Sequence, residues 1–172
     1  MANYYQKEDK TEFFRTPGWM IEKCYEMIPN AKTILDPCAG DCGLEDFTRD
    51  VEYTLLDLKP RSNVIEQADF LKWTTEKHFD AAICNPPFGL KNEFLEHLFE
   101  FTDEVVYIIT GKFMNDSYGL TESNAYPNDL TIQAIPLNIV ENAAALVIAR
   151  FEIGGRWFDD IVANNARRED EK

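Results

Sequence analysis

The sequence of 172 residues lacks the patterns of metal-binding, membrane and secreted proteins. No apolar run approaches membrane-spanning length, and the first residues are polar, unlike a secretory signal. The few cysteines form no CxxC pair and stand at no ligand spacing with His78 or His97, which argues against a zinc site. Free thiols without a disulfide pattern suit a reducing compartment, so we expect a cytoplasmic protein with no membrane partner and no metal.

Two of the four cysteines, Cys38 and Cys42, fall in one predicted loop. A two-cysteine metal or redox site there is the less favoured alternative to small residues that pack in a tight turn.

Positive charge is also scarce, with 17 Lys and Arg against 31 Asp and Glu and a net charge of −14. A protein that binds duplex DNA unaided normally carries a basic face, so the balance disfavours that class, or favours a protein partner that supplies basic surface or target recognition. A local basic patch remains compatible with the sequence, and its candidate members are Arg15, Lys59, Arg61, Lys72, Lys91 and Lys112.

Short apolar runs alternate with helical patterns along the chain. Helices are predicted over 19–28, directly after Pro17, and over 93–101. This alternation predicts an α/β fold with a mostly parallel sheet covered on both faces, and the last two strands are close enough for an antiparallel hairpin. The strands are expected at 33–35, 52–56, 63–66, 79–84, 104–109, 131–135 and 144–151.

A glycine-containing turn follows the first predicted strand in the stretch ILDPCAGDCGL. Gly40 and Gly43 there would let the backbone approach a ligand closely before a probable helix. Asp57 ends the next strand at the distance where an acid can accept hydrogen bonds from a ribose hydroxyl pair. Asp69 could accept a hydrogen bond from an adenine amino group. The plainer alternatives are a solvated Asp57 and an Asp69 that caps a turn.

The stretch NPPF, residues 85–88, ends a buried strand with two prolines. An aromatic amine is a poor nucleophile because its lone pair is delocalised into the ring. The Asn85 side-chain oxygen and the Pro86 carbonyl could accept hydrogen bonds from both N–H groups, and rigid prolines would hold these acceptors in place. Phe88 offers a face on which a planar base can stack. A proline-stopped strand with a buried Phe is the alternative.

Five motifs in this order resemble those of class I S-adenosylmethionine-dependent methyltransferases, and within them the gamma-type N6-adenine DNA methyltransferases. The matching stretches are Arg15-Thr16-Pro17, Asp36-Pro37-Cys38-Ala39-Gly40, Leu56-Asp57-Leu58, Ala68-Asp69-Phe70-Leu71 and Asn85-Pro86-Pro87-Phe88-Gly89. The resemblance implies that Asn85, Pro86, Pro87 and Phe88 are catalytic. It also implies that S-adenosylmethionine is bound by Thr16, Pro17, Asp36, Pro37, Cys38, Ala39, Gly40, Asp57, Leu58, Asp69, Phe70 and Asn85.

The resemblance further implies a Rossmann-like three-layer sandwich with a seven-stranded sheet whose last strand is antiparallel. We expect one catalytic domain over 1–172, without a separate target-recognition domain, and a substrate-side loop over 111–130. The expected acceptor is adenine N6 in DNA. RNA adenine, a protein glutamine amide and a non-catalytic cofactor-binding subunit stay open as alternatives. A dehydrogenase is disfavoured because the third glycine is missing and NPPF would have no role.

Overall fold

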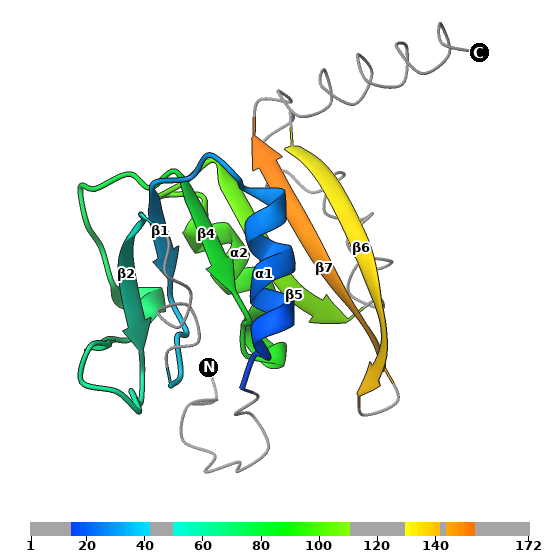
Figure 1. The fold of residues 1–172 in the computed structure, drawn as a ribbon. Helices are drawn as coiled ribbons and strands as arrows, with labels where there is room; N and C mark the ends of the chain where they lie inside the picture. The colour runs from blue at the N-terminus through cyan, green and yellow to red at the C-terminus, as the bar shows by residue number, and fades with distance from the viewer. Residues whose placement is uncertain (1–14, 42–49, 111–129, 142–143, 154–172) are drawn as a thin grey trace, which may run out of the picture.

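The computed structural model describes residues 15–41, 50–110, 130–141 and 144–153. Its strands form one seven-stranded sheet in the order β3-β2-β1-β4-β5-β7-β6 (Figure 1). The sheet and its antiparallel β7 confirm the architecture that the sequence predicts. The strands are β1 (Thr33–Asp36), β2 (Glu52–Asp57), β3 (Glu66–Gln67), β4 (Ala81–Cys84), β5 (Glu104–Thr110), β6 (Leu130–Glu141) and β7 (Ala144–Ile153).

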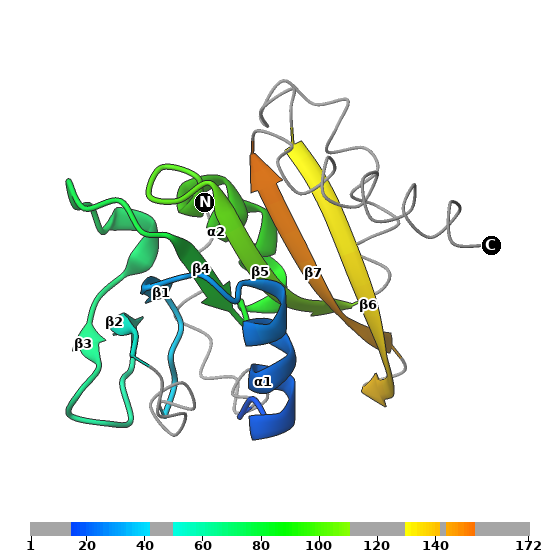
Figure 2. The same ribbon diagram turned by 45° about the horizontal axis from the view of Figure 1, so that its top comes forward.

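The chain reverses its direction of travel across the sheet between β1 and β4. From β1 it moves outward to β2 and β3, and it then returns to place β4 on the other side of β1, in parallel. Figure 2 shows β3 at the outer edge, beyond β2. Such a reversal opens a crevice at the carboxyl ends of the strands, where α/β proteins bind ligands.

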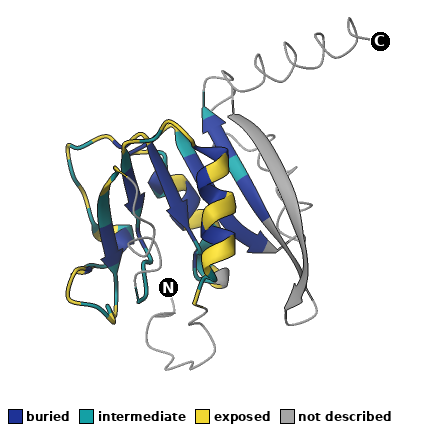
Figure 3. Ribbon diagram, in the orientation of Figure 1, coloured by how far each residue is buried: buried dark blue, intermediate teal, exposed yellow. Residues whose placement is uncertain are grey.

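Helix α1 (Gly18–Met27) covers one face of the sheet, and α2 (Lys91–Leu98) covers the other (Figure 1). The carbonyl of Pro17 accepts hydrogen bonds from the amides of Met20 and Ile21, which starts α1 directly after the proline, as predicted. The helix buries a stripe of side chains and exposes its other side, which Figure 3 shows as yellow on the outer surface of α1.

Alternate residues of β1 and β4 enter two separate apolar cores. Ile34 and Ile83 pack on the α1 side, whereas Leu35 and Ala82 pack on the α2 side. All four residues of β4 are buried, as expected for a central parallel strand covered on both faces. The two cores and the sheet between them make the three layers, and they fix the strand ends rigidly.

The boundaries differ from the prediction where side chains meet solvent. The expected strand at 63–66 is instead a turn followed by the two-residue β3, and Val64 there is 50% exposed. Helix α2 starts two residues earlier than expected and ends at Leu98, after which Phe101 enters the core from a turn. The predicted hairpin is confirmed, with β6 and β7 both longer than expected.

Parts of the prediction lie outside the described residues: Cys42, Gly43 and the helix expected after them, Lys112, and the substrate-side loop over 111–129. Leu130, the last residue assigned to that loop, begins β6. Within the described ranges, the helices are too short or too polar to cross a membrane.

Candidate functional site

The loops that follow β1 and β4 meet at the point where the chain reverses direction. Cys38 comes from the first loop, and its Sγ lies 3.0 Å from Sγ of Cys84, the last residue of β4. The Cys38 thiol also donates a hydrogen bond of 3.1 Å to the backbone carbonyl of Asn85. The glycine turn and the NPPF stretch are therefore in direct contact. The sequence pointed to Cys42 as the neighbour of Cys38, whereas the structure places Cys84 beside it.

Asp57 organises the glycine turn. One carboxylate oxygen accepts the amide N–H of Gly40 at 2.8 Å, and the other accepts that of Lys59 at 2.7 Å. Gly40 has φ 61°, a left-handed conformation that a residue without Cβ adopts at little cost. The Ala39 amide bonds the Leu56 carbonyl at 2.8 Å, which ties the same turn to β2. Asp57 is thus a fixed carboxylate at the strand end and not a mobile, solvated side chain.

Asp36 is the most perturbed carboxylate in this region. The pKa of its carboxyl group is raised to about 7, mainly because burial disfavours the charged form; the hydrogen bond of 3.0 Å from the Cys38 amide lowers the pKa, and the negative charge of Asp57 raises it. An acid held partly protonated near neutral pH is poised to become an anion when a cation arrives beside it. Pro37, which follows it, is buried.

The side chains of Asp69 and Phe70 have different surroundings, although the two residues are adjacent in the chain. Oδ2 of Asp69 forms an ion pair of 2.7 Å with Lys72, while its Oδ1 is buried and has no hydrogen-bond partner among the described residues. The Phe70 ring is 2% exposed and packs 5.1 Å from Phe94 and 4.8 Å from His97, measured between ring centroids. The Phe70 side chain therefore belongs to the core on the α2 side, and its role as a cofactor contact stays a prediction. Its backbone remains beside Asp69, at the start of a 3-10 turn, η2 (Phe70–Lys72).

The side chain of Asn85 bonds the segment before α1. Its Nδ2 donates a hydrogen bond of 3.2 Å to Oγ1 of Thr16, a residue 69 positions earlier in the chain. Pro86 is buried and Pro87 leads into the 3-10 turn η3 (Phe88–Leu90), so the backbone after Asn85 is held in place. The side chain of Phe88 is outside the described part of the structure, and its stacking role stays a prediction.

The carboxyl edge of the sheet carries basic as well as acidic residues, and two of the basic ones form ion pairs, Arg15 with Asp41 and Lys72 with Asp69. Segments that follow parallel strands border the carboxyl edge, as does Arg15, next to Thr16. Five of the six predicted patch residues lie in these segments: Arg15, Lys59, Arg61, Lys72 and Lys91. At the opposite, amino edge Asp50 and Asp103 lie before β2 and β5, and Glu52 and Glu104 begin these strands.

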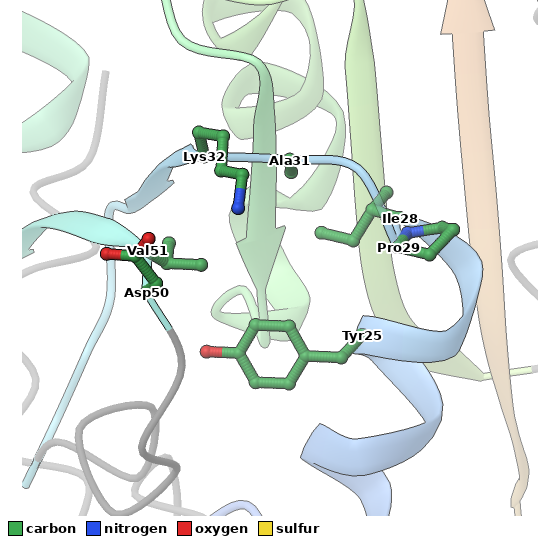
Figure 4. Close-up of a pocket in the computed structure, with 7 residues that line it drawn as sticks. All are labelled: Tyr25, Ile28, Pro29, Ala31, Lys32, Asp50 and Val51. Carbon is green, nitrogen blue, oxygen red and sulfur yellow. The ribbon is translucent and has the colours of Figure 1, made fainter.

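A pocket of about 260 Å³ lies at the amino edge, away from this site. Figure 4 shows that Tyr25 of α1, Lys32 before β1, and Asp50 and Val51 before β2 line it. Tyr25 is 1% exposed and its hydroxyl bonds that of Tyr53, so this end of the sheet is packed around side-chain contacts of its own. None of the predicted site residues lines the pocket.

No protein-family model matches the sequence, and no curated protein matches it. Solved structures do match. A protein of Pyrococcus horikoshii described as a candidate RNA methyltransferase superposes with a TM-score of 0.61 at 19% identity, over 83% of this chain and 88% of that one. The 23S rRNA methyltransferase ErmE gives 0.59 at 16% identity, over 82% and 70%. A dimethyladenosine transferase of Plasmodium falciparum gives 0.59 at 14% identity, over 81% and 62%. The chain thus has the α/β fold of methyltransferases.

The structure brings most predicted site residues to one edge of the sheet. Leu58 lies directly after Asp57, and Pro17 directly after Thr16. Two features were missed: the hydrogen bond between Thr16 and Asn85, and the contact between Cys38 and Cys84. Both join segments far apart in the chain, so local patterns carry no signal for them. The order of the motifs was the sole hint that these segments meet.

Proposed function

We propose that the protein is an S-adenosylmethionine-dependent methyltransferase that methylates the exocyclic N6 of adenine in RNA. The observation that carries the proposal is the direct contact between the glycine turn and the Asn85-Pro86-Pro87 stretch. Cys38 makes this contact at the point where the chain reverses its direction across the sheet. A cofactor held by the turn would lie beside a target held by Asn85.

The residues at this edge fit the cofactor. Asp57 is fixed by two backbone N–H groups, and a carboxylate has further lone pairs with which to accept hydrogen bonds from ribose hydroxyls. Oδ1 of Asp69, which is buried and has no hydrogen-bond partner among the described residues, is suited to accept a hydrogen bond from the adenine amino group of the cofactor. Asp36 supplies a carboxyl group that a cationic ligand would convert to its anion.

Asn85 is proposed to act on the target amine. When bound, S-adenosylmethionine supplies an electrophilic methyl group on its sulfonium sulfur. The Asn85 side-chain oxygen and the Pro86 carbonyl would accept the two N–H groups of the adenine, which keeps the lone pair of the nitrogen available for in-line attack on that methyl carbon. The new nitrogen–carbon bond would form as the methyl–sulfur bond breaks, which would release S-adenosylhomocysteine. The amine proton would then pass to water, so no strong base would be needed. Orientation by rigid prolines supplies the remaining rate enhancement.

RNA is favoured over DNA as the substrate because solved structures with a similar fold are described as RNA methyltransferases. The similar structures include an rRNA methyltransferase, a dimethyladenosine transferase and aTrm5 in complex with a tRNA, although aTrm5 is covered over 48% of its length. Lys59, Arg61 and Lys91, which follow strands at the carboxyl edge, would face an RNA backbone there. DNA is the second candidate, because the motif order resembles DNA enzymes.

The remainder of the proposal concerns the parts around the site. We propose one catalytic domain, with residues 111–129 as the substrate-side loop. The net charge of −14 makes a basic protein partner the proposed source of additional affinity for RNA.

The test is methyl transfer from labelled S-adenosylmethionine by the purified chain to separate pools of single- and double-stranded RNA, DNA and protein. We expect label in RNA, recovered as N6-methyladenosine after digestion and mass analysis. Label in DNA alone would show that the substrate is DNA, and the proposed chemistry on adenine would stand. Label in protein as methylglutamine would show that both the substrate and the methylated group differ from the proposal. Absence of transfer to every pool, with calorimetry showing no cofactor binding, would overturn the proposal.

A further inference from the structure

Asn85 is held from two sides by parts of the chain that come from different elements. The side-chain amide donates to Thr16 Oγ1 at 3.2 Å, and the backbone carbonyl accepts the Cys38 thiol at 3.1 Å. Thr16 precedes α1, and Cys38 follows β1. The two contacts fix different atoms of the same residue, so they can be separated by substitution.

The contact with Thr16 matters because an asparagine amide has two ends of similar shape and opposite chemistry. The oxygen accepts hydrogen bonds, while the nitrogen donates two. A target amine needs acceptors, so a rotation of the amide by half a turn would present a donor to a donor. In the structure Nδ2 is the end that faces Thr16, whose hydroxyl accepts its hydrogen bond, and this arrangement directs Oδ1 to the opposite side.

We propose that Thr16 is a positioning residue that sets the orientation of the Asn85 amide for catalysis. This rests on the proposed function, in which Asn85 accepts hydrogen bonds from the target amine. It differs from the cofactor contact that the sequence resemblance implies for Thr16, because its effect would appear in the rate of transfer and not in cofactor affinity.

The position of Thr16 is well defined by its neighbours. The Pro17 carbonyl accepts the amides of Met20 and Ile21 at 2.9 and 3.3 Å. Met20 and Ile21 are 1% and 3% exposed in the core beneath α1. The segment is thus anchored one residue after Thr16, which allows its hydroxyl to act as a fixed acceptor. Burial raises the pKa of the Cys38 thiol, so the thiol stays protonated and keeps its hydrogen bond to the Asn85 carbonyl.

The first experiment compares Thr16→Val with Thr16→Ser, which keeps the hydroxyl. We expect Thr16→Val to lower kcat by about tenfold to a hundredfold, with the calorimetric Kd for S-adenosylmethionine within about threefold of the wild type. Thr16→Ser should restore most of kcat. The matched control is Thr75→Val, which also removes a hydroxyl that accepts one hydrogen bond of 3.2 Å, from the Lys77 amide, but at the amino edge. Its kcat should be unchanged.

The second experiment repeats Thr16→Val in an Asn85→Asp background. A carboxylate accepts hydrogen bonds at both oxygens, so it needs no choice of orientation. Thr16→Val should then cost less than about threefold in kcat. An equal loss in both backgrounds would overturn the proposal. If Asn85→Asp has no measurable activity, the comparison of Thr16→Val with Thr16→Ser decides the matter alone.

The outcomes separate the positioning role from the proposed function. If Asn85→Ala is inactive and Thr16→Val has wild-type kcat at saturating cofactor and RNA, the positioning role is wrong and the function stands. If Thr16→Val raises the cofactor Kd alone, Thr16 is a cofactor contact. If Asn85→Ala turns over normally, the proposed function itself has failed.

Discussion

Asp36 and Asp80 both accept backbone N–H groups, but they lie at opposite edges of the sheet and their pKa values shift in opposite directions. Asp80, before β4, accepts the amides of Lys32 and Thr33 at 2.8 and 2.9 Å, and these bonds lower its pKa. Asp36, at the end of β1, is partly buried and accepts the Cys38 amide, and desolvation raises the pKa of its carboxyl group to about 7.

The difference separates a carboxylate that stabilises the fold from one that, under the proposed function, would receive a cationic ligand. Asp80 is exposed and its charge is satisfied by the chain, so it closes the turn between the starts of β1 and β4. Asp36 is under-satisfied as an anion, next to the carboxylate of Asp57. An unfavourable carboxylate of this kind is typical of a site where a ligand, and not another residue of the chain, supplies the compensating interaction.

The largest expected effect contrasts the two ends of β2. Asp57→Ala removes the acceptor of the Gly40 and Lys59 amides, and it should weaken S-adenosylmethionine binding by about tenfold to a hundredfold. Glu52→Ala, at the other end of the strand, breaks an exposed ion pair with Lys77 and should change the Kd by less than about twofold. Calorimetry measures both. Equal effects would remove the distinction between the edges.

The pH dependence of cofactor binding tests Asp36. Because the pKa of Asp36 is raised to about 7, a cationic cofactor must displace its proton below that pH. Affinity should therefore rise with pH, by at most about tenfold per pH unit, and level off above about 7. Asp36→Asn should remove this part of the dependence and leave the titration of the cofactor's own amino group. An unchanged profile in the variant would contradict the assignment.

The stability of the fold tests Asp80. Its pKa is lowered on folding, so its contribution is present above the ordinary value of 3.8 and is lost as pH falls through the folded value. Asp80→Ala should cost roughly 1 to 2 kcal/mol in urea unfolding at neutral pH, and less in acid. Asp36→Asn should act in the opposite sense, because a raised pKa makes the wild type lose stability as pH rises from 3.8 to about 7. Matching profiles for both variants would refute the contrast.

The smallest expected effect compares one lysine from each edge. Lys59→Ala, after β2, should raise the KM for RNA about threefold and flatten the salt dependence of binding by roughly one counterion. Lys77→Ala removes an ion pair and a contact 4.9 Å above the Phe79 ring at the amino edge, and it should leave RNA binding unchanged. Equal losses of RNA binding in the two variants would show that RNA does not prefer the carboxyl edge to the amino edge.

Much of the fold could be predicted from the sequence because buried parallel strands leave a plain local signal. The apolar run 79–84 predicted β4, and Pro17 predicted the start of α1. The strand expected at 63–66 was misplaced because Val64, although β-branched, faces solvent, and tertiary pairing begins only at Glu66. Exposure of a single side chain is not encoded in so short an apolar run.

The residues that the sequence singled out lie largely at one edge of the sheet, but their contacts could not be predicted from it. Asp57 was selected by its distance from the glycine turn, and Asp69 by its place after a strand. Phe70 was assigned to the cofactor by the resemblance of its motif, and its ring packs with Phe94 in the core on the α2 side. Neighbours in sequence need not face the same space, and the direction of a side chain depends on core packing that no local motif records.

We propose that residues at the carboxyl edge of the sheet catalyse the methylation of adenine. The most direct test measures the formation of N6-methyladenosine in RNA by the wild type and by Asn85→Ala. We expect the wild type to form the product. We expect Asn85→Ala to bind S-adenosylmethionine with nearly unchanged affinity and to lose at least about a hundredfold in turnover. Equal product formation by the two proteins would contradict the proposal.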